Sequence, residues 1–207
     1  HMYKQQGRGY GKLPPRHAEI APWNEVCIDL IGPWEIVVNG NICVFKALTC
    51  IDPVTNLTEL IRIQNKTMGH VAEQFENVWL SRYPRPNRCV HDNGGEFIGW
   101  KFLNLLSRYG IKDVCTAVRN PQANAICERM HQTIGDILRV VLHTNPPQNM
   151  NDASQVMDNT LATCMHAMRC SVSAPIGTTP GAMVFGRDMI MDVPLLANLA
   201  AIRDGRQ

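Results

Sequence analysis

The sequence lacks any long apolar run and any strong excess of one charge. No stretch reaches the roughly 18 consecutive apolar residues of a membrane-spanning helix, and no basic start leads into an apolar signal segment. Basic and acidic residues number 20 and 18, so a net charge of +2 does not mark a strongly basic nucleic-acid binder. We therefore expect a soluble intracellular protein without a membrane partner, in which any DNA contact depends on local clusters of basic residues.

The eight cysteines also lack a functional pattern. No Cys-x-x-Cys pair and no Cys/His set at zinc spacing is present, and most cysteines lie within apolar runs. Such cysteines are typical of small buried side chains in a reducing compartment. Since 45% of the residues are hydrophobic, the chain can bury the core of one sizeable domain.

Composition divides the chain into three parts. Residues 1–18 contain glycines, a Pro14-Pro15 pair and several basic residues without an apolar period, which predicts a flexible lead-in with His1-Met2 as a cloning remnant. Residues 19–194 carry the periodic apolar segments of a folded domain. Residues 195–207 are predicted to form a loose tail.

Apolar periodicity predicts an α/β domain. Strand-like runs cover 23–31, ending at Gly32-Pro33, then 36–38 and 42–51 on either side of an Asn39-Gly40-Asn41 turn, and 57–63. Together they predict an antiparallel three-strand meander. Further strands are expected at 88–91 and 111–115, and helices at 71–79, 96–109, 121–145, 152–169 and 179–185. This order predicts a five-stranded mixed sheet flanked by helices.

Asp29 interrupts an apolar strand-like run. Its own face carries Cys27 and Ile31. The opposite face carries Ile28 and Leu30. A carboxylate is costly to bury there unless it is paired or binds a metal, so Asp29 is a candidate metal ligand.

Two further acids have ordinary explanations when each is taken alone. Asp92 begins an Asp-Asn-Gly-Gly sequence that suits a turn, and Glu128 suits the solvated face of a helix. As a set they are more informative, because Asp29 lies in the first strand, Asp92 at the end of the fourth, and Glu128 near the start of the helix after the fifth. Thirty-five residues lie between Asp92 and Glu128.

Three sequence blocks carry a resemblance to a known family. CIDLIGPW at 27–34, VHDNGGEF at 90–97 and NPQANAICERMHQTIGDILR at 120–139 resemble the catalytic blocks of retroviral and long-terminal-repeat retrotransposon integrases, the D,D-35-E group. TTPGAMVFGRD at 178–188 resembles the segment that closes the core in the Ty3/gypsy branch. The resemblance covers residues 19–194, which are therefore similar to an integrase catalytic core.

This resemblance implies an RNase H-like fold with Asp29, Asp92 and Glu128 as catalytic residues at one edge of the sheet. It implies two Mg²⁺ or Mn²⁺ ions per active site, Asp29 bridging both and the other two acids holding one each. These ions prefer hard oxygen ligands, and a pair of them stabilises the entering and leaving oxygens of phosphodiester exchange. The implied reactions are 3′-end processing of element DNA and strand transfer to target DNA, with the protein in the nucleus when it acts.

The resemblance also suggests residues around the site. Asn93 either supports Asp92 or makes the turn, and the neighbouring His91 is expected to be structural. Amide residues match the family loop that approaches DNA; they are Asn120, Gln122 and Asn124. The nearest basic residues are interpreted as phosphate contacts or, equally, as solvated surface charges; they are Lys66, Arg119 and Arg129.

Two departures from the family pattern bear on function. Ala125 stands where many relatives have glycine, which predicts a stiffer loop, and the family's zinc-binding amino-terminal and DNA-binding carboxy-terminal domains are not expected in this chain. Two other functions stay open: a host-adopted core that binds DNA or assembles without catalysis, and a different RNase H-like nuclease. Because relatives dimerise and ten methionines suggest adaptable apolar surface, we expect a homodimer or higher oligomer formed through helices.

Overall fold

The computed structural model describes residues 21–115, 121–174, 176–187 and 189, without the side chains of 121–125. The predicted lead-in and tail therefore lie outside the described residues.

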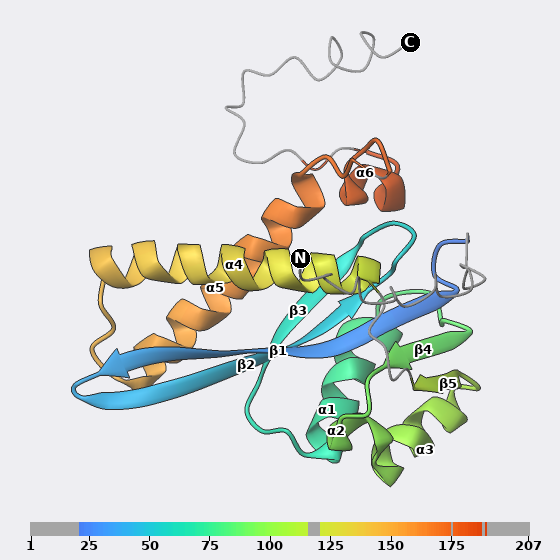
Figure 1. Cartoon of the computed structure of the whole chain (residues 1–207), viewed down its shortest axis with the longest axis horizontal. Helices are drawn as coiled ribbons and strands as arrows, with labels where there is room; N and C mark the ends of the chain where they lie inside the picture. Colours follow the sequence, from blue (N-terminus) through green and yellow to red (C-terminus); the bar gives the residue numbers. More distant parts are fainter. Residues whose placement is uncertain (1–20, 116–120, 175, 188, 190–207) are drawn as a thin grey trace, which may run out of the picture.

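Three antiparallel strands form one half of the sheet (Figure 1). β1 (Glu25–Val38) and β2 (Asn41–Ile51) join through a two-residue turn at Asn39 and Gly40, whose φ angles are 50° and 81°. A turn with two positive φ angles matches the twist of the strands it connects. β3 (Thr58–Ile63) pairs antiparallel with β2, which confirms the predicted meander.

β1 is longer than predicted. We expected it to end at Gly32-Pro33, but it continues to Val38 and pairs with β2 again beyond a bulge between Ile31 and Trp34. The bulge accommodates Pro33, which has no N–H to donate to the neighbouring strand. Gly32 has a φ of 109°, and a Cβ on it would lie 2.9 Å from the carbonyl oxygen of Phe45. The Gly-Pro pair therefore marks a bulge rather than a strand end.

Two parallel strands complete the sheet. β4 (Arg88–His91) pairs with β1, and β5 (Lys112–Cys115) pairs with β4. The strand order is β3-β2-β1-β4-β5, which confirms the predicted five-stranded mixed sheet.

Helices cover both faces of this sheet (Figure 1). One face packs against α4 (Pro121–Thr144) and α5 (Met150–Cys170). The other packs against α1 (Met68–Phe75), its π-helical continuation η1 (Glu76–Leu80), α2 (Gly95–Ile98) and α3 (Trp100–Arg108). A short helix, α6 (Pro180–Phe185), contacts α5.

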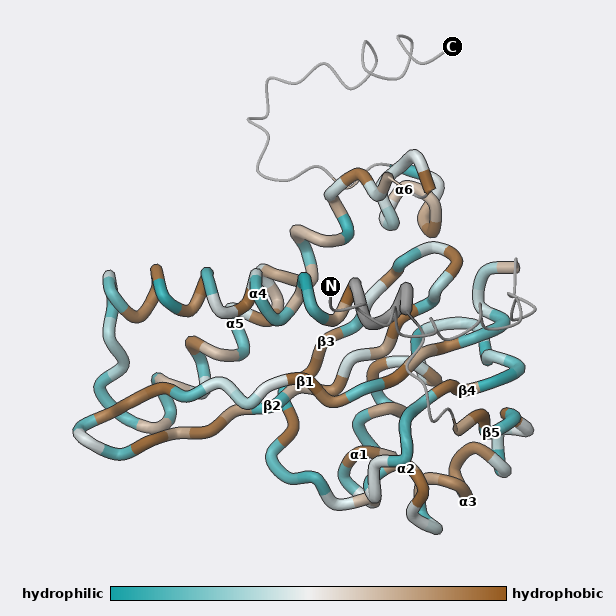
Figure 2. Tube along the Cα trace, in the orientation of Figure 1, coloured by the Kyte–Doolittle hydropathy of each residue, from teal (hydrophilic) through white to brown (hydrophobic). Residues whose placement is uncertain are grey.

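Alternation along β1 supplies both cores. Cys27 and Ile31 belong to the core under α4 and α5, whereas Val26 and Ile28 belong to the core against α1 and α3. Figure 2 shows apolar segments, in brown, along the central strands β1 and β2. This α/β architecture is the predicted RNase H-like fold.

The helix predicted at 96–109 is two helices. Gly99 has extended backbone angles, φ −71° and ψ 146°, and separates α2 from α3. Met68 occupies the adjacent space, since its Sδ would lie 2.7 Å from a Cβ at position 99. The break therefore accompanies a close approach of α1, which helical periodicity cannot reveal.

Two expectations from composition can be compared with the structure. In the part of the chain that the structure describes, no helix has the length and apolar character needed to cross a membrane. Six of the eight cysteines are buried, as expected, whereas Cys115 is exposed and Cys170 is half-buried.

Candidate active site

Asp29 lies in the middle of β1 and is half-buried. Its neighbours on the same face, Cys27 and Ile31, are buried in the core beneath α4. The backbone N–H of Leu30 donates to Asp29 Oδ1 at 2.8 Å. A carboxylate that interrupts this apolar strand is thus held at the border between the core and solvent.

Asp92 follows the last residue of β4. In the parallel pairing of β1 and β4, Cys27 is opposite Val90, and both belong to the core under α4 and α5. The pairing ends there, and Asp29 and Asp92 each follow this pair by two residues, which is the spacing of side chains on one face of an extended chain. The Asp92 carboxylate also accepts a hydrogen bond from the Gly94 N–H at 2.9 Å, which closes the turn after the strand.

Glu128 lies on α4 and is exposed. The preceding residue, Cys127, is buried on the sheet, where its Sγ lies 3.8 Å from Oγ1 of Thr49. Thr49 is the β2 partner of Asp29 and donates to the Asp29 carbonyl oxygen at 3.1 Å. Thr49 therefore connects the strand that carries Asp29 to the helix turn that carries Glu128.

These positions do not amount to a preformed metal centre. Among the described residues, no three His, Cys, Asp or Glu side chains form a group that could hold a metal ion. The donor chemistry nevertheless fits Mg²⁺ or Mn²⁺, because all three acids offer hard oxygen ligands. The exposed Glu128 has to approach the two aspartates before the three can share ions.

His91 supports Asp92, a contact that sequence analysis did not identify. Its ring is buried, with Nε2 2.6 Å from Oδ1 of Asp113 and Nδ1 2.7 Å from the Asp92 carbonyl oxygen. The rings of Phe97 and Phe102 pack against it. The expectation of a structural His91 agrees with these contacts, which fix the backbone that presents Asp92.

Asn93 is exposed next to Asp92, and its Oδ1 accepts a hydrogen bond from the Cys115 thiol at 2.8 Å. Asn93 thus ties the turn after β4 to the end of β5. The sequence did not identify Thr49 as a partner of Asp29 and Cys127, or Cys115 as a partner of Asn93. The one available signal was that Thr49 is polar within the apolar run of β2.

The predicted DNA contacts are dispersed. Arg119 and Asn120 lie outside the described residues, as do the side chains of Gln122 and Asn124. Arg129 follows Glu128 and lines a cavity of about 230 Å³ between α4, α5 and α6. Lys66 is instead in the loop from β3 to α1, beside Lys46 of β2, so the structure does not bring it to the α4 face.

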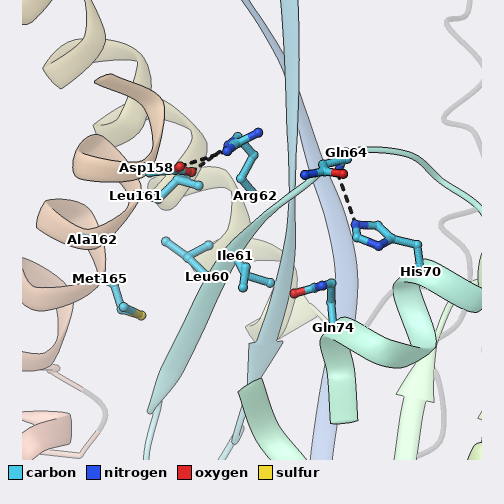
Figure 3. Close-up of a pocket in the computed structure, with 10 residues that line it drawn as sticks. All are labelled: Leu60, Ile61, Arg62, Gln64, His70, Gln74, Asp158, Leu161, Ala162 and Met165. Atoms are coloured by element: carbon cyan, nitrogen blue, oxygen red, sulfur yellow. Dashed lines mark hydrogen bonds and ion pairs between the residues drawn. The ribbon is translucent and has the colours of Figure 1, made fainter. Parts of the chain in front are cut away.

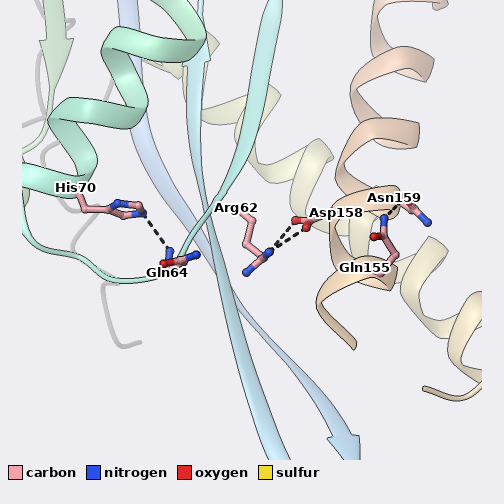
Figure 4. Close-up of polar contacts among 6 residues, drawn as sticks. All are labelled: Arg62, Gln64, His70, Gln155, Asp158 and Asn159. Carbon is pink, nitrogen blue, oxygen red and sulfur yellow. Dashed lines mark hydrogen bonds and ion pairs between the residues drawn. The ribbon is translucent and has the colours of Figure 1, made fainter. Parts of the chain in front are cut away.

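A separate cavity of about 390 Å³ lies between β3, α1 and α5 (Figure 3). Arg62 of β3 and Asp158 of α5 form a two-pronged ion pair there, at 2.6 and 2.9 Å, and His70 Nε2 accepts from the Gln64 N–H at 3.3 Å (Figure 4). Asp158 raises the pKa of Arg62. Arg62 and Asp158 in this cavity are already paired with each other, and none of the three candidate acids lines it.

Comparisons with known proteins place the fold. No protein-family model matches the chain. The Retrovirus-related Pol polyprotein from transposon TNT 1-94 of Nicotiana tabacum is 29% identical over 116 residues, which are 55% of this chain but 9% of that polyprotein. The chain therefore spans a small part of that relative's length.

Solved structures of integrases share the architecture. The catalytic core domain of BIV integrase matches with a TM-score of 0.56 and 18% identity, covering 79% of this chain and 95% of that one. The HTLV-2 integrase catalytic core domain in complex with magnesium, in its trimeric form, matches with a TM-score of 0.59 and 16% identity. The match covers 79% of this chain and 97% of that one. A simian T-cell lymphotropic virus intasome in complex with PP2A regulatory subunit B56 gamma matches with a TM-score of 0.63 and 13% identity. The match covers 87% of this chain and 60% of that one. The chain thus has the fold of a retroviral integrase catalytic core, and the predicted resemblance to integrase cores is confirmed; the Ty3/gypsy branch stays a prediction.

Proposed function

We propose that this chain is the catalytic core of a retroelement integrase, which trims the 3′ ends of element DNA and joins them to target DNA in the nucleus. The observation that carries the proposal is the pairing of Cys27 with Val90 in two parallel strands, since Asp29 and Asp92 each follow that pair by two residues. The α4 turn that carries Glu128 packs on the same sheet face through Cys127 and Thr49. The likeness to integrase cores supports it.

In this proposal Asp29, Asp92 and Glu128 would hold two Mg²⁺ or Mn²⁺ ions. When bound, such ions stabilise the charge on the attacking and leaving oxygens of phosphodiester exchange. The neighbour HTLV-2 core was solved with magnesium, which agrees with this choice of ion.

The chain's own residues orient these ligands. Leu30 and Gly94 donate backbone hydrogen bonds to the two aspartates, and His91 fixes the Asp92 backbone. Glu128 stands on a helix anchored by Cys127, so a small movement of its exposed side chain can bring it towards the DNA and the aspartates. Arg129, together with Asn120, Gln122 and Asn124, is proposed to contact the DNA end.

A strand-transfer assay with Mn²⁺ and labelled donor DNA tests the proposal. We expect Glu128→Gln to reduce joined product by about 100-fold or more, because a neutral amide is a poor ligand for the second ion. Glu35→Gln, which changes an exposed acid on the outer part of β1, is the matched control and should retain activity.

Each alternative function has its own outcome. Equal product from wild type and Glu128→Gln would contradict the catalytic assignment. DNA binding without any product from the wild type would favour the non-catalytic module. Cleavage of the RNA strand in a hybrid would favour a different RNase H-like nuclease.

A further inference from the structure

Three of the four lysines among the described residues gather on the α1 and α3 side of the sheet. Lys46 of β2 and Lys66 of the β3–α1 loop line one cavity of about 190 Å³. Lys101 of α3 reaches the first turn of α1, where a Cβ on Gly69 would lie 3.3 Å from its Nζ. Gly69 is three residues after Lys66, so Lys101 lies beside the start of the helix that follows the Lys66 loop. We call these three residues the lysine cluster.

The charges of the lysine cluster are not neutralised within the described part of the chain. No carboxylate lies within ion-pair distance of any of the three, whereas five arginines are paired with acids; these are Arg62, Arg88, Arg108, Arg139 and Arg169. Contact with the Lys66 ammonium, followed by desolvation, lowers the pKa of Lys46, and the charge of Glu96 opposes this shift only in part. An anion between the lysines would relieve this repulsion.

An exposed aromatic ring adjoins the lysine cluster. Trp100 is 66% exposed, whereas Trp34 and Trp79 are buried. The Lys101 Nζ lies 5.7 Å from the centre of the Trp100 ring. Ammonium groups beside an exposed ring are typical of surfaces that bind a nucleic-acid backbone, where phosphates meet lysines and a sugar or base packs on the ring.

The lysine cluster also lies next to the candidate active site. The charge of Glu96 acts to raise the pKa of Lys46. The carboxyl carbon of Glu96 lies 3.1 Å from the position of a Cβ on Gly94, and the Gly94 N–H donates a hydrogen bond to Asp92. One short turn therefore separates the two regions. Glu96 thus connects the surroundings of Lys46 to the turn that follows Asp92.

We propose that Lys46, Lys66 and Lys101, with Trp100 beside them, form a second contact site for the phosphate backbone of duplex DNA. The choice of DNA as the polyanion rests on the proposed function. Lys66 was a candidate from the sequence, but Lys46, Lys101 and Trp100 are identified by the structure.

The salt dependence of DNA binding tests this site without any catalysis. Binding of a fluorescent duplex to the full chain in EDTA is measured by anisotropy over a range of salt concentrations. The variant with all three lysines changed to alanine should bind about 10-fold or more weakly, with the log–log salt slope reduced by about 0.9 for each lost phosphate contact. Lys112→Ala, which removes the other described lysine, is the control and should leave the slope unchanged.

Chemical footprinting gives a readout that does not depend on the variant's folding. Bound duplex should protect the three lysines of the wild type from acetylation more than Lys112, and should shield Trp100 from iodide quenching. An unchanged salt slope in a folded triple variant, or equal acetylation of the four described lysines with and without duplex, would overturn the proposal. Equal protection by inorganic phosphate at the same concentration of phosphate groups would overturn it too, since the site would then be one for small anions.

The two proposals fail separately. If the triple lysine variant keeps the wild-type salt slope, the difference in strand transfer between wild type and Glu128→Gln is unaffected. Absence of strand transfer leaves the salt slope measurable.

Discussion

At the scale of single residues, Tyr83 contributes a buried hydrogen bond whose effect on stability can be tested. Its hydroxyl donates to the buried Glu59 of β3, which also accepts from Arg169 of α5 at 2.5 Å. Burial, followed by the hydrogen bond to Glu59, raises the pKa of Tyr83 from 10.0 to about 12. The folded state therefore keeps the phenol protonated over a range in which the unfolded chain loses the proton.

The sign of the pH dependence follows from this difference. Stability due to the raised pKa is fully present below pH 10 and is lost as the pH rises from 10 towards about 12. We expect the free energy of unfolding, from urea titrations, to fall over this range in the wild type and to fall less in Tyr83→Phe. Identical slopes in the two proteins would contradict the assignment.

The site shows which residues can be predicted from sequence. Asp29 could be predicted because alternation in β1 placed a carboxylate on a buried face. Thr49 and His91 could not be assigned their roles, because each acts through partners more than 20 residues away or through a backbone atom. The sequence says which residues are unusual in their own segment, and the fold decides what each one contacts.

At the scale of elements, the break at Gly99 is the sharpest prediction. A Cβ there would lie 2.7 Å from Sδ and 2.8 Å from Cβ of Met68, so α1 would have to move. We expect Gly99→Ala to lower the free energy of unfolding by about 1–3 kcal/mol, as overpacking does. Thermal and urea unfolding measure this change.

Gly135→Ala is the matched control for this prediction. Gly135 lies inside α4, where a Cβ would meet no other atom within 4 Å. Alanine favours a helix over glycine by up to about 1 kcal/mol, so the control should be neutral or more stable. If Gly99→Ala is as stable as Gly135→Ala, the close approach of α1 is not important for stability.

The predicted boundaries of helices and strands were correct where an apolar repeat extends over many residues. They were wrong where a contact with one residue of another element sets the boundary. The helices at 121–144 and 150–170 follow their apolar stripes closely. The bulge at Gly32 depends on the carbonyl of Phe45, and the break at Gly99 depends on Met68. Both glycines were visible in the sequence, but the neighbours that need them come from other elements.

At the scale of the whole molecule, charge is organised although the net charge is only +2. The candidate acids lie on the α4 side of the sheet, and the lysine cluster lies on the α1 and α3 side across the Asp92 turn. Its lysines come from three separate elements. Composition therefore could not predict a local basic surface that only the fold assembles.

Self-association is the remaining prediction at this scale. We expect the chain to form a homodimer through helices, and α5 beside the β3–α1 cavity is the surface to test, since the half-buried apolar side chains of Ile61 and Met165 line that cavity (Figure 3). Ala162 is exposed on its rim, so Ala162→Glu adds a charge there without disturbing the core and should shift the molar mass measured by light scattering from dimer to monomer. Gln155→Glu adds the same charge to α5 outside the cavity (Figure 4) and should leave the dimer intact. A monomeric wild type at high concentration would refute the predicted dimer. If Ala162→Glu remains dimeric, the interface is formed by another helix.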